Sequence, residues 1–165
     1  MRPTPRLALK IDPDFTPARA NLAQLYNGTG RNADAERVLT EGLKRIPTIG
    51  ELQYSLGLLL AEEKRIDEAA AALAKAAKLL PERARVHYNL GLALQQLGRR
   101  QPAEAALLQA QKLEPRDPAI CYALAVLYAQ GRQYTQALPW AEKALALDPA
   151  NVQARQLVNE LHARQ

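Results

Sequence analysis

Side chains able to carry acid–base or metal chemistry are few and scattered in this sequence. His87 and His162 are its two histidines, and no carboxylate or cysteine lies at metal-ligand spacing from either. Cys121 is the single cysteine, so the chain has neither a disulfide framework nor a CxxC motif. No phosphate-binding loop, nucleophile elbow or acid pair occurs. We therefore predict no catalytic residue, no metal site and no cofactor, and we expect His87 and Cys121 to be packed in the core.

Basic side chains recur at a fixed interval and suggest a second kind of chemistry. Arg31, Arg65 and Arg99 are spaced 34 residues apart at expected turns, and the net charge is +5. Such a row could meet an acidic protein or a phosphate backbone. The alternative is a solvated turn that keeps the chain soluble. Because no exposed aromatics are interleaved, the pattern does not favour nucleic acid as a partner.

A row of lysines has the same spacing, and each lysine lies three residues before a proline. Lysine at the last turn of a helix complements the helix dipole, and acidic residues do so at the first turn. We interpret these residues as devices for folding. The lysines are Lys10, Lys44, Lys78 and Lys112, and the acidic residues are Asp34, Asp67, Glu68 and Glu104.

The elements that position all these residues repeat every 34 residues. The repeating prolines are Pro13, Pro47, Pro81, Pro115 and Pro149. Twelve residues before the last four stand Ala35, Ala69, Ala103 and Ala137. Twenty-five residues before them stand Leu22, Leu56, Leu90 and Leu124, each followed by a small residue: Ala23, Gly57, Gly91 and Ala125. This regularity identifies an internal repeat, in which each block contacts only its neighbours.

The pattern resembles the tetratricopeptide repeat, whose 34-residue signature has an aromatic, a Leu-Gly pair, a Tyr, an Ala, a Phe and a closing Pro. Tyr26 and Tyr128 occupy the signature tyrosine, where Leu60 and Leu94 replace it. Leu39, Leu73 and Leu107 stand for the phenylalanine, and Ala141 departs from it. At the opening aromatic position stand Arg19, Gln53, His87 and Cys121, which should weaken the first contact of each repeat.

The resemblance implies an all-α solenoid of helix-turn-helix units wound into a right-handed superhelix. We expect four full repeats at residues 16–49, 50–83, 84–117 and 118–151. Residues 1–15 read as the tail of an incomplete preceding repeat, and residues 152–165 as a capping helix with an apolar stripe at Ala154, Leu157, Val158 and Leu161. We therefore expect the chain to begin inside a repeat and to be the C-terminal part of a larger protein.

In this family the first helices line a concave groove that holds an extended peptide or a helix of a partner. Matching positions predict a groove with an aromatic row, an aliphatic row and amide groups: Asn21, Gln24, Tyr54, Leu58, Arg85, Tyr88, Asn89, Leu92, Gln96, Tyr122 and Val126. Tyr88 and Asn89 are expected to contribute most. Alternatively, the tyrosines pack between adjacent first helices, and the two roles are compatible. The places that grip a chaperone's C-terminal carboxylate in one subgroup hold Ala20, Tyr54, Leu58 and Ala119, which does not favour that clamp.

The resulting prediction is a bacterial, non-enzymatic protein–protein interaction scaffold with a protein or peptide partner. Its alternative is an assembly module that self-associates through the apolar flank of Leu7, Leu9 and Ile11. Residues 18–26 also resemble arrays fused behind bacterial secreted or haem-bearing domains, although nothing in this chain could bind haem. The longest apolar run, residues 119–129, falls short of the roughly 18 residues of a membrane span. The sequence does not separate a cytoplasmic from a periplasmic location.

Overall fold

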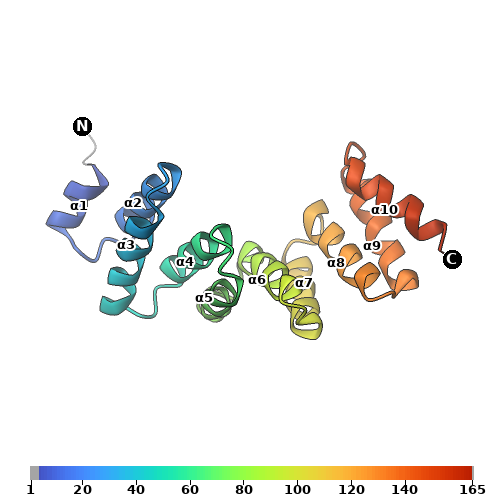
Figure 1. Cartoon of the computed structure of the whole chain (residues 1–165), viewed down its shortest axis with the longest axis horizontal. Coiled ribbons are helices and arrows are strands. Elements are labelled where there is room, and N and C mark those ends of the chain that lie inside the picture. The colour runs from blue at the N-terminus through green and yellow to red at the C-terminus, as the bar shows by residue number, and fades with distance from the viewer. Residues whose placement is uncertain (1–3, 165) are drawn as a thin grey trace. The chain divides into compact units, whose positions relative to one another are not determined.

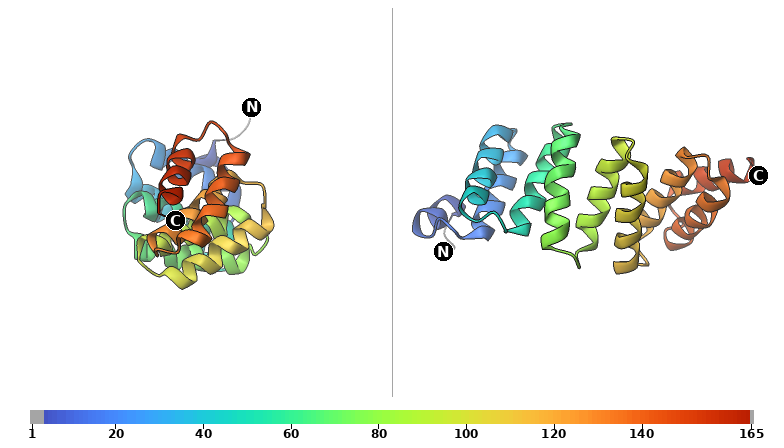
Figure 2. Two further views of the ribbon diagram at one scale, coloured as in Figure 1. Left: turned by 90° about the vertical axis from the view of Figure 1, so that its right-hand side faces the viewer. Right: turned by 90° about the horizontal axis from the view of Figure 1, so that it is seen from below.

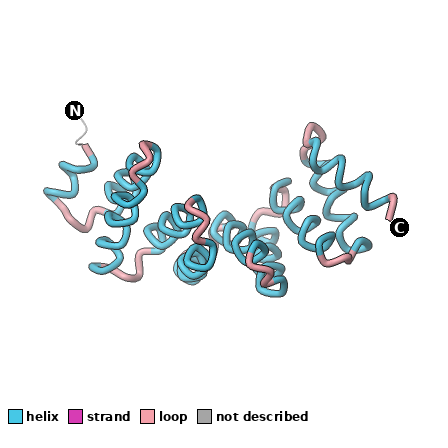
Figure 3. Tube along the Cα trace, viewed as in Figure 1, coloured by secondary structure: helices cyan, strands magenta, loops and turns pink. Residues whose placement is uncertain are grey.

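The computed structural model describes residues 4–164, which form ten α-helices and no strand (Figures 1 and 3). The chain divides into two compact units, residues 1–81 and residues 82–165. The helices occupy the segments that the 34-residue period marks, and short turns join them. The predicted all-α fold of paired helices is therefore confirmed.

The first unit holds five helices. They are α1 (Pro5–Ile11), α2 (Thr16–Gly28), α3 (Asn32–Arg45), α4 (Gly50–Glu62) and α5 (Ile66–Leu79). Helices α2 and α3 form one hairpin, α4 and α5 form the next, and α1 packs on α2. The apolar faces of these helices build a core that includes Leu22, Leu39 and Leu52. A helix pair that buries one stripe per helix accounts for the alternation of leucine and alanine in this half of the chain.

The second unit repeats this arrangement with five further helices. They are α6 (Ala84–Gln96), α7 (Arg100–Leu113), α8 (Pro118–Gln130), α9 (Tyr134–Leu147) and α10 (Val152–His162). Hairpin α6–α7 is followed by hairpin α8–α9, and α10 packs on α9 (Figure 2, right-hand view). Leu107, Ile120, Leu124 and Leu161 lie at the centre of one continuous core. The stripe of α10 packs as expected, with Ala154, Val158 and Leu161 buried.

The small residue of each repeat sets how closely the two helices of a hairpin approach. A Cβ atom on Gly91 would lie 2.6 Å from Leu107 Cγ, and one on Gly57 would lie 2.7 Å from Leu73 Cγ. Both leucines are fully buried. Glycine therefore allows the close approach of Leu73 and Leu107 in these two hairpins, whereas the first repeat has Ala23 and Leu39 at the equivalent positions.

The turns inside the hairpins share one backbone conformation. Residues at 34-residue intervals have positive φ: Gly30 (74°), Lys64 (64°), Gly98 (68°) and Arg132 (58°). This left-handed conformation is free of strain for glycine and unfavourable by about 1–2 kcal/mol for other residues. Lys64 and Arg132 therefore adopt a backbone conformation that is unfavourable for residues other than glycine.

The helix ends follow the charge pattern read from the sequence, except that Glu104 is the fifth residue of α7 and lies beyond its first turn. Lys10, Lys44, Lys78 and Lys112 all lie in the last turn of a helix, as predicted. Helix α7 begins at Arg100, and Pro102 is its third residue. The backbone N–H of that position still lacks a partner within the helix, so proline is tolerated there.

Arg19 replaces the opening aromatic of the first repeat in an unexpected way. Its side chain is only 7% exposed. The guanidinium donates hydrogen bonds to the Pro13 carbonyl, at 2.7 and 2.9 Å, and to the Val38 carbonyl at 3.1 Å. Gly42 leaves room for it, because a Cβ there would lie 2.7 Å from Arg19 Cδ. The first contact of this repeat is therefore a hydrogen-bonded cation that ties the α1–α2 loop to α3.

Candidate functional site

The predicted binding residues of the second unit lie in stripes on α6 and α8. Tyr88, Leu92 and Gln96 follow one another at four-residue spacing on α6, and Tyr122, Val126 and Gln130 do so on α8. Four-residue spacing places each set on one side of its helix. All six side chains are half-buried or exposed, and α6 contacts α8. We call this surface the α6/α8 face.

The two tyrosines of the α6/α8 face are packed on one side. Tyr88 lies against the core of the second unit, and the Arg85 guanidinium lies 5.7 Å from the centre of its ring. Burial raises the pKa of the Tyr88 hydroxyl. Tyr122 packs against the buried cluster of Cys121, Ala144 and Ala154. Both rings therefore contribute to packing, while part of each remains accessible.

In the first unit, α2 and α4 carry the remaining predicted residues. Asn21 and Gln24 are exposed on α2, and Tyr54 and Leu58 are half-buried on α4. Helices α2 and α4 are in contact, so this subset also lies on neighbouring helices. The predicted groove is thus represented by one subset within each unit.

Not every predicted polar residue is available to a partner. Tyr54 and Asn89 already interact with other groups of the chain. Asn89 therefore differs from the exposed Gln96, whose amide faces solvent. The prediction that Asn89 contributes most to binding remains untested, and we base the binding proposal on other residues of the face.

A polar link between first helices recurs in both units. Asn27 Nδ2 donates a hydrogen bond of 2.6 Å to Glu62 Oε2, joining α2 to α4. Gln95 Nε2 donates one of 2.8 Å to Gln130 Oε1, joining α6 to α8. The two pairs stand at equivalent positions, two repeats apart. In the second pair the Gln130 amide group keeps its own N–H donors for other partners.

A pocket of about 300 Å³ continues the α6/α8 face onto α10. Val126 and Gln130 belong to its wall, so the predicted surface and the pocket are one continuous region. The other lining residues were not predicted from the sequence; those that follow residue 151 were assigned to a capping helix without a binding role. The other lining residues are Ala129, Tyr134, Leu157, Glu160, Leu161 and Arg164. Leu157 could have been identified from the sequence, since it belongs to the apolar stripe of α10. In the structure it is only half-buried.

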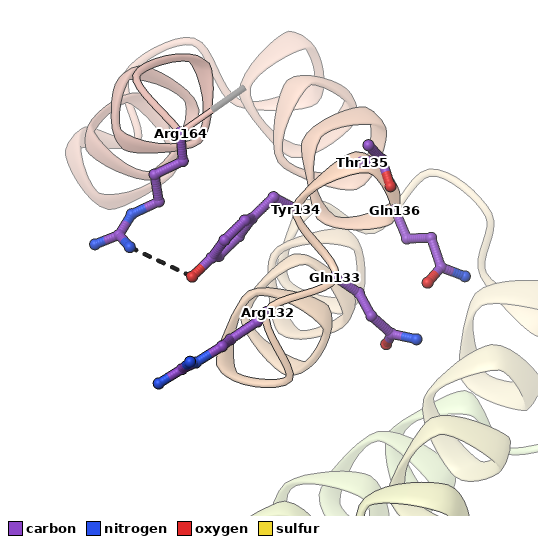
Figure 4. A pocket seen from close by; sticks show the side chains of 6 residues that line it. All are labelled: Arg132, Gln133, Tyr134, Thr135, Gln136 and Arg164. Atoms are coloured by element: carbon purple, nitrogen blue, oxygen red, sulfur yellow. Dashed lines mark hydrogen bonds between the residues drawn. The ribbon is translucent and has the colours of Figure 1, made fainter.

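A second pocket, of about 550 Å³, adjoins the first at the start of α9 and shares Tyr134 and Arg164 with it. Figure 4 shows Arg132, Tyr134 and Arg164 extending on one side of the first turn of α9. Arg164 Nη1 donates a hydrogen bond of 3.3 Å to the Tyr134 hydroxyl, and its guanidinium lies 5.4 Å from the ring centre. Gln133, Thr135 and Gln136 complete the lining.

The arginine row at the turns does not form a free basic edge. Arg65 Nη1 lies 2.7 Å from a Glu36 oxygen and 3.1 Å from a Glu63 oxygen, and Arg65 Nη2 lies 2.6 Å from Glu68 Oε2. These carboxylates raise the pKa of Arg65, and Arg65 lowers the pKa of Glu68. A guanidinium surrounded by three carboxylates has little charge left for a phosphate backbone.

The neighbouring arginines of this row are engaged as well. Arg31 pairs with Asp34 at 2.5 Å, and its guanidinium lies 4.4 Å from the centre of the Tyr26 ring. Arg99 also interacts within the chain. The arrangement therefore supports the interpretation that these arginines belong to solvated turns. It does not favour the alternative that they form a surface for nucleic acid.

The part of the chain that the structure describes offers no built centre for chemistry. Within residues 4–164, no group of three His, Cys, Asp or Glu side chains could hold a metal ion. Cys121 is fully buried, and burial raises the pKa of its thiol, which makes it a poor nucleophile. Among these residues, no helix combines the length and apolarity of a membrane span.

Successive helix hairpins that contact their neighbours within each unit are typical of helical repeat proteins. A family model described as tetratricopeptide repeat matches residues 88–152, and a model described as TPR repeat matches residues 57–98. The chain belongs to the tetratricopeptide repeat family, as the sequence predicted. Members of this family typically serve as non-catalytic interaction scaffolds.

Solved structures with the same fold include three informative neighbours. PilF from Pseudomonas aeruginosa is 27% identical, and the match covers 96% of this chain and 72% of PilF with a TM-score of 0.85. A mutant of MamA is 30% identical over 79% of this chain and 76% of its own, with a TM-score of 0.72. YrrB, described as a TPR protein with an unusual peptide-binding site, is 18% identical over 98% of this chain and 84% of its own, with a TM-score of 0.87. No curated protein matches the chain.

Proposed function

We propose that this chain is a non-catalytic scaffold that binds a segment of a partner protein along the α6/α8 face. The observation that carries the proposal is the pairing of half-buried or exposed side chains 34 residues apart on the adjacent helices α6 and α8. An aromatic pair (Tyr88 and Tyr122) is followed by an aliphatic pair (Leu92 and Val126) and an amide pair (Gln96 and Gln130). Peptide binding by the fold neighbour YrrB is consistent with this use.

The chemistry of these rows suits a peptide better than a small molecule. Rings that are already packed on one side lose little conformational entropy when a ligand covers the other side. Amide side chains can both donate to and accept from the backbone of an extended segment. The surface offers apolar contact and regularly spaced hydrogen-bonding groups, and a peptide presents both along its length.

Panning a phage-displayed peptide library on the full chain tests the proposal. Affinities of the selected peptides are then measured for Val126→Asp and for Ala105→Asp, a matched control that places the same charge on the exposed side of α7. We expect Val126→Asp to weaken binding at least about tenfold, or about 1.4 kcal/mol, and Ala105→Asp to have little effect. Both variants are first compared by circular dichroism to confirm equal helix content.

Selected peptides that bind both variants equally would place the binding surface elsewhere and refute the proposal. A panning experiment that enriches no sequence would also contradict it. Tyr122→Leu offers an independent check, because it keeps apolar volume on α8 and removes the aromatic contact. We expect it to weaken binding less than Val126→Asp does.

Self-association is a second candidate function, favoured by the apolar surface near α1. Ile11 is 76% exposed, Leu7 48% and Phe15 46%. Large apolar side chains gathered in one short segment are typical of interaction surfaces. Light scattering on the full chain and on a variant lacking residues 1–15 tests this candidate. Dimers that persist after the deletion would have to use another surface.

A further inference from the structure

The two adjoining pockets beside α10 differ in chemistry and meet at shared residues. The smaller pocket has an apolar wall of Val126, Ala129, Leu157 and Leu161. The larger pocket carries two guanidinium groups, from Arg132 and Arg164, and no carboxylate among its lining residues. Because Tyr134 and Arg164 line both, a single ligand could occupy them together.

Of the two pockets, only the smaller has a carboxylate among its lining residues, that of Glu160, and the larger has none. Among residues 4–164, neither Arg132 nor Arg164 is ion-paired with a carboxylate, whereas Arg31, Arg45 and Arg65 of the first unit all are. The Arg164 guanidinium makes a hydrogen bond and a ring contact with Tyr134. This holds its guanidinium beside the smaller pocket. An anion placed between the two arginines would gain charge-assisted hydrogen bonds that the protein itself does not supply.

We propose that these pockets together bind a peptide segment in which an apolar side chain is followed by a carboxylate. The apolar side chain enters the smaller pocket, and the carboxylate lies between Arg132 and Arg164 over the Tyr134 ring. The inference rests on the proposed function, because Val126 and Gln130 belong both to the α6/α8 face and to the smaller pocket. The carboxylate can come from an acidic side chain or from the C-terminus of the partner.

The backbone conformation of Arg132 allows a substitution that should raise stability and lower affinity at the same time. Its φ of 58° lies in the region that Gly30 and Gly98 occupy at the equivalent turns. Arg132→Gly relieves this conformation and removes the guanidinium. We therefore expect the variant to be more stable than the wild type and to bind carboxylate peptides more weakly. Loss of binding could not then be explained by misfolding. Lys64→Gly is the matched control, since it relieves the same strain in a turn that does not line the pockets.

The experiment follows backbone amide and arginine side-chain signals of the full chain by NMR during titration with N-acetylated tetrapeptides. One peptide ends in leucine with a free carboxylate, and a second is its C-terminal amide. A third ends in leucine and aspartate as the amide, and a fourth replaces that aspartate by asparagine. Signals of Val126, Leu157, Arg132 and Arg164 report on the two pockets.

We expect a carboxylate peptide to bind at least about tenfold more tightly than its neutral counterpart, since hydrogen bonds to charged groups contribute about 1.5–3 kcal/mol. Comparison of the first and third peptides identifies the preferred source of the carboxylate. Arg132→Gly and Arg164→Gln should each remove most of this preference. Lys64→Gly and Arg116→Gln, which removes an exposed charge elsewhere in the second unit, should retain it.

Equal binding of acidic and neutral peptides, or no binding of any of the four, would overturn the inference. Unchanged preference in Arg132→Gly and Arg164→Gln would do so as well. These results are distinguishable from failure of the proposed function. If panned peptides without an acidic group still lose affinity with Val126→Asp, the α6/α8 face binds peptides and only the carboxylate assignment is wrong.

Discussion

The hydrogen bond between Tyr128 and Glu104 provides a quantitative test of how the hairpins of the second unit are held together. Tyr128 is 6% exposed, and its hydroxyl donates to Glu104 Oε1 at 2.6 Å, joining α8 to α7. Hydrogen bonds to a charged group contribute about 1.5–3 kcal/mol when buried. Since Glu104 is half-buried and reaches water, we expect Tyr128→Phe to lower the free energy of unfolding by about 1.5 kcal/mol at pH 7.

The pH dependence follows from the same contact. Burial, with a further contribution from the hydrogen bond to Glu104, raises the pKa of Tyr128 from 10.0 to about 12 in the folded chain. A raised pKa means that the stabilisation is complete below about pH 10 and is lost as the pH rises toward about 12. At about pH 11 the loss amounts to about 1.4 kcal/mol, so the wild type and Tyr128→Phe should then be almost equally stable.

Urea unfolding followed by the fluorescence of Trp140 measures this difference. Trp140 is the single tryptophan of the chain and lies in the second unit, so the signal reports the unit that contains the bond. With m-values of about 1–3 kcal/mol/M, the midpoint should fall by about 0.5–1.5 M at pH 7. The Glu104→Gln variant and the double variant complete a cycle, whose coupling energy should be about 1 kcal/mol.

Two results would refute this reasoning. Equal midpoints for the wild type and Tyr128→Phe at pH 7 would mean that the bond contributes no net stability. A difference that stays constant from about pH 8 to about pH 11 would mean that the hydroxyl is not held in its protonated form by burial.

Three further variants test other features of the fold. Lys64→Gly should raise stability by about 1 kcal/mol, because it relieves a positive φ; a lower thermal midpoint by circular dichroism would contradict this. Gly91→Ala should lower stability by about 1–2 kcal/mol, because the cost of overpacking against Leu107 is larger than the favourable change in helix propensity. In the double variant Gly91→Ala/Leu107→Ala, the loss of unfolding free energy should be smaller than the sum of the losses in the two single variants, as measured by urea unfolding. Arg19→Met should lower stability by about 1–3 kcal/mol, because two carbonyls lose their donor, and an unchanged thermal midpoint would exclude that role.

The periodic features of the sequence predicted the fold well because they act locally. The spacing of Leu90, Gly91 and Ala103 indicates which sides of two helices meet. The lysines before each proline identify helix ends, since the dipole effect is confined to the last turn. Cys121 was expected to be a small buried residue, and it is fully buried. Local spacing and local electrostatics were sufficient for these predictions.

Contacts that depend on distant partners were beyond the reach of the same reasoning. The sequence left open whether Arg65 belongs to a basic edge or to a solvated turn, and only the folded chain brings Glu36, 29 residues earlier, against it. Arg19 looked like a lost aromatic contact, and only the folded arrangement brings the Val38 carbonyl to it. Tyr134 and Arg164, 30 residues apart, form a pocket wall that no repeat position marks. Periodicity assigns a side of a helix and does not identify which side chain lies opposite.

The α6/α8 face links binding to stability through the same side chains. Tyr88 lies against the core of the second unit, and Tyr122 lies against the buried cluster of Cys121, Ala144 and Ala154. Truncating either ring to alanine therefore removes packing together with any ligand contact, so a lower affinity would have two explanations. Arg132 and Val126 are more informative positions. The first can be changed to glycine with a gain in stability, and the second has a matched control on α7. Binding differences at these two positions, measured at known helix content, will separate recognition of a partner from maintenance of the fold.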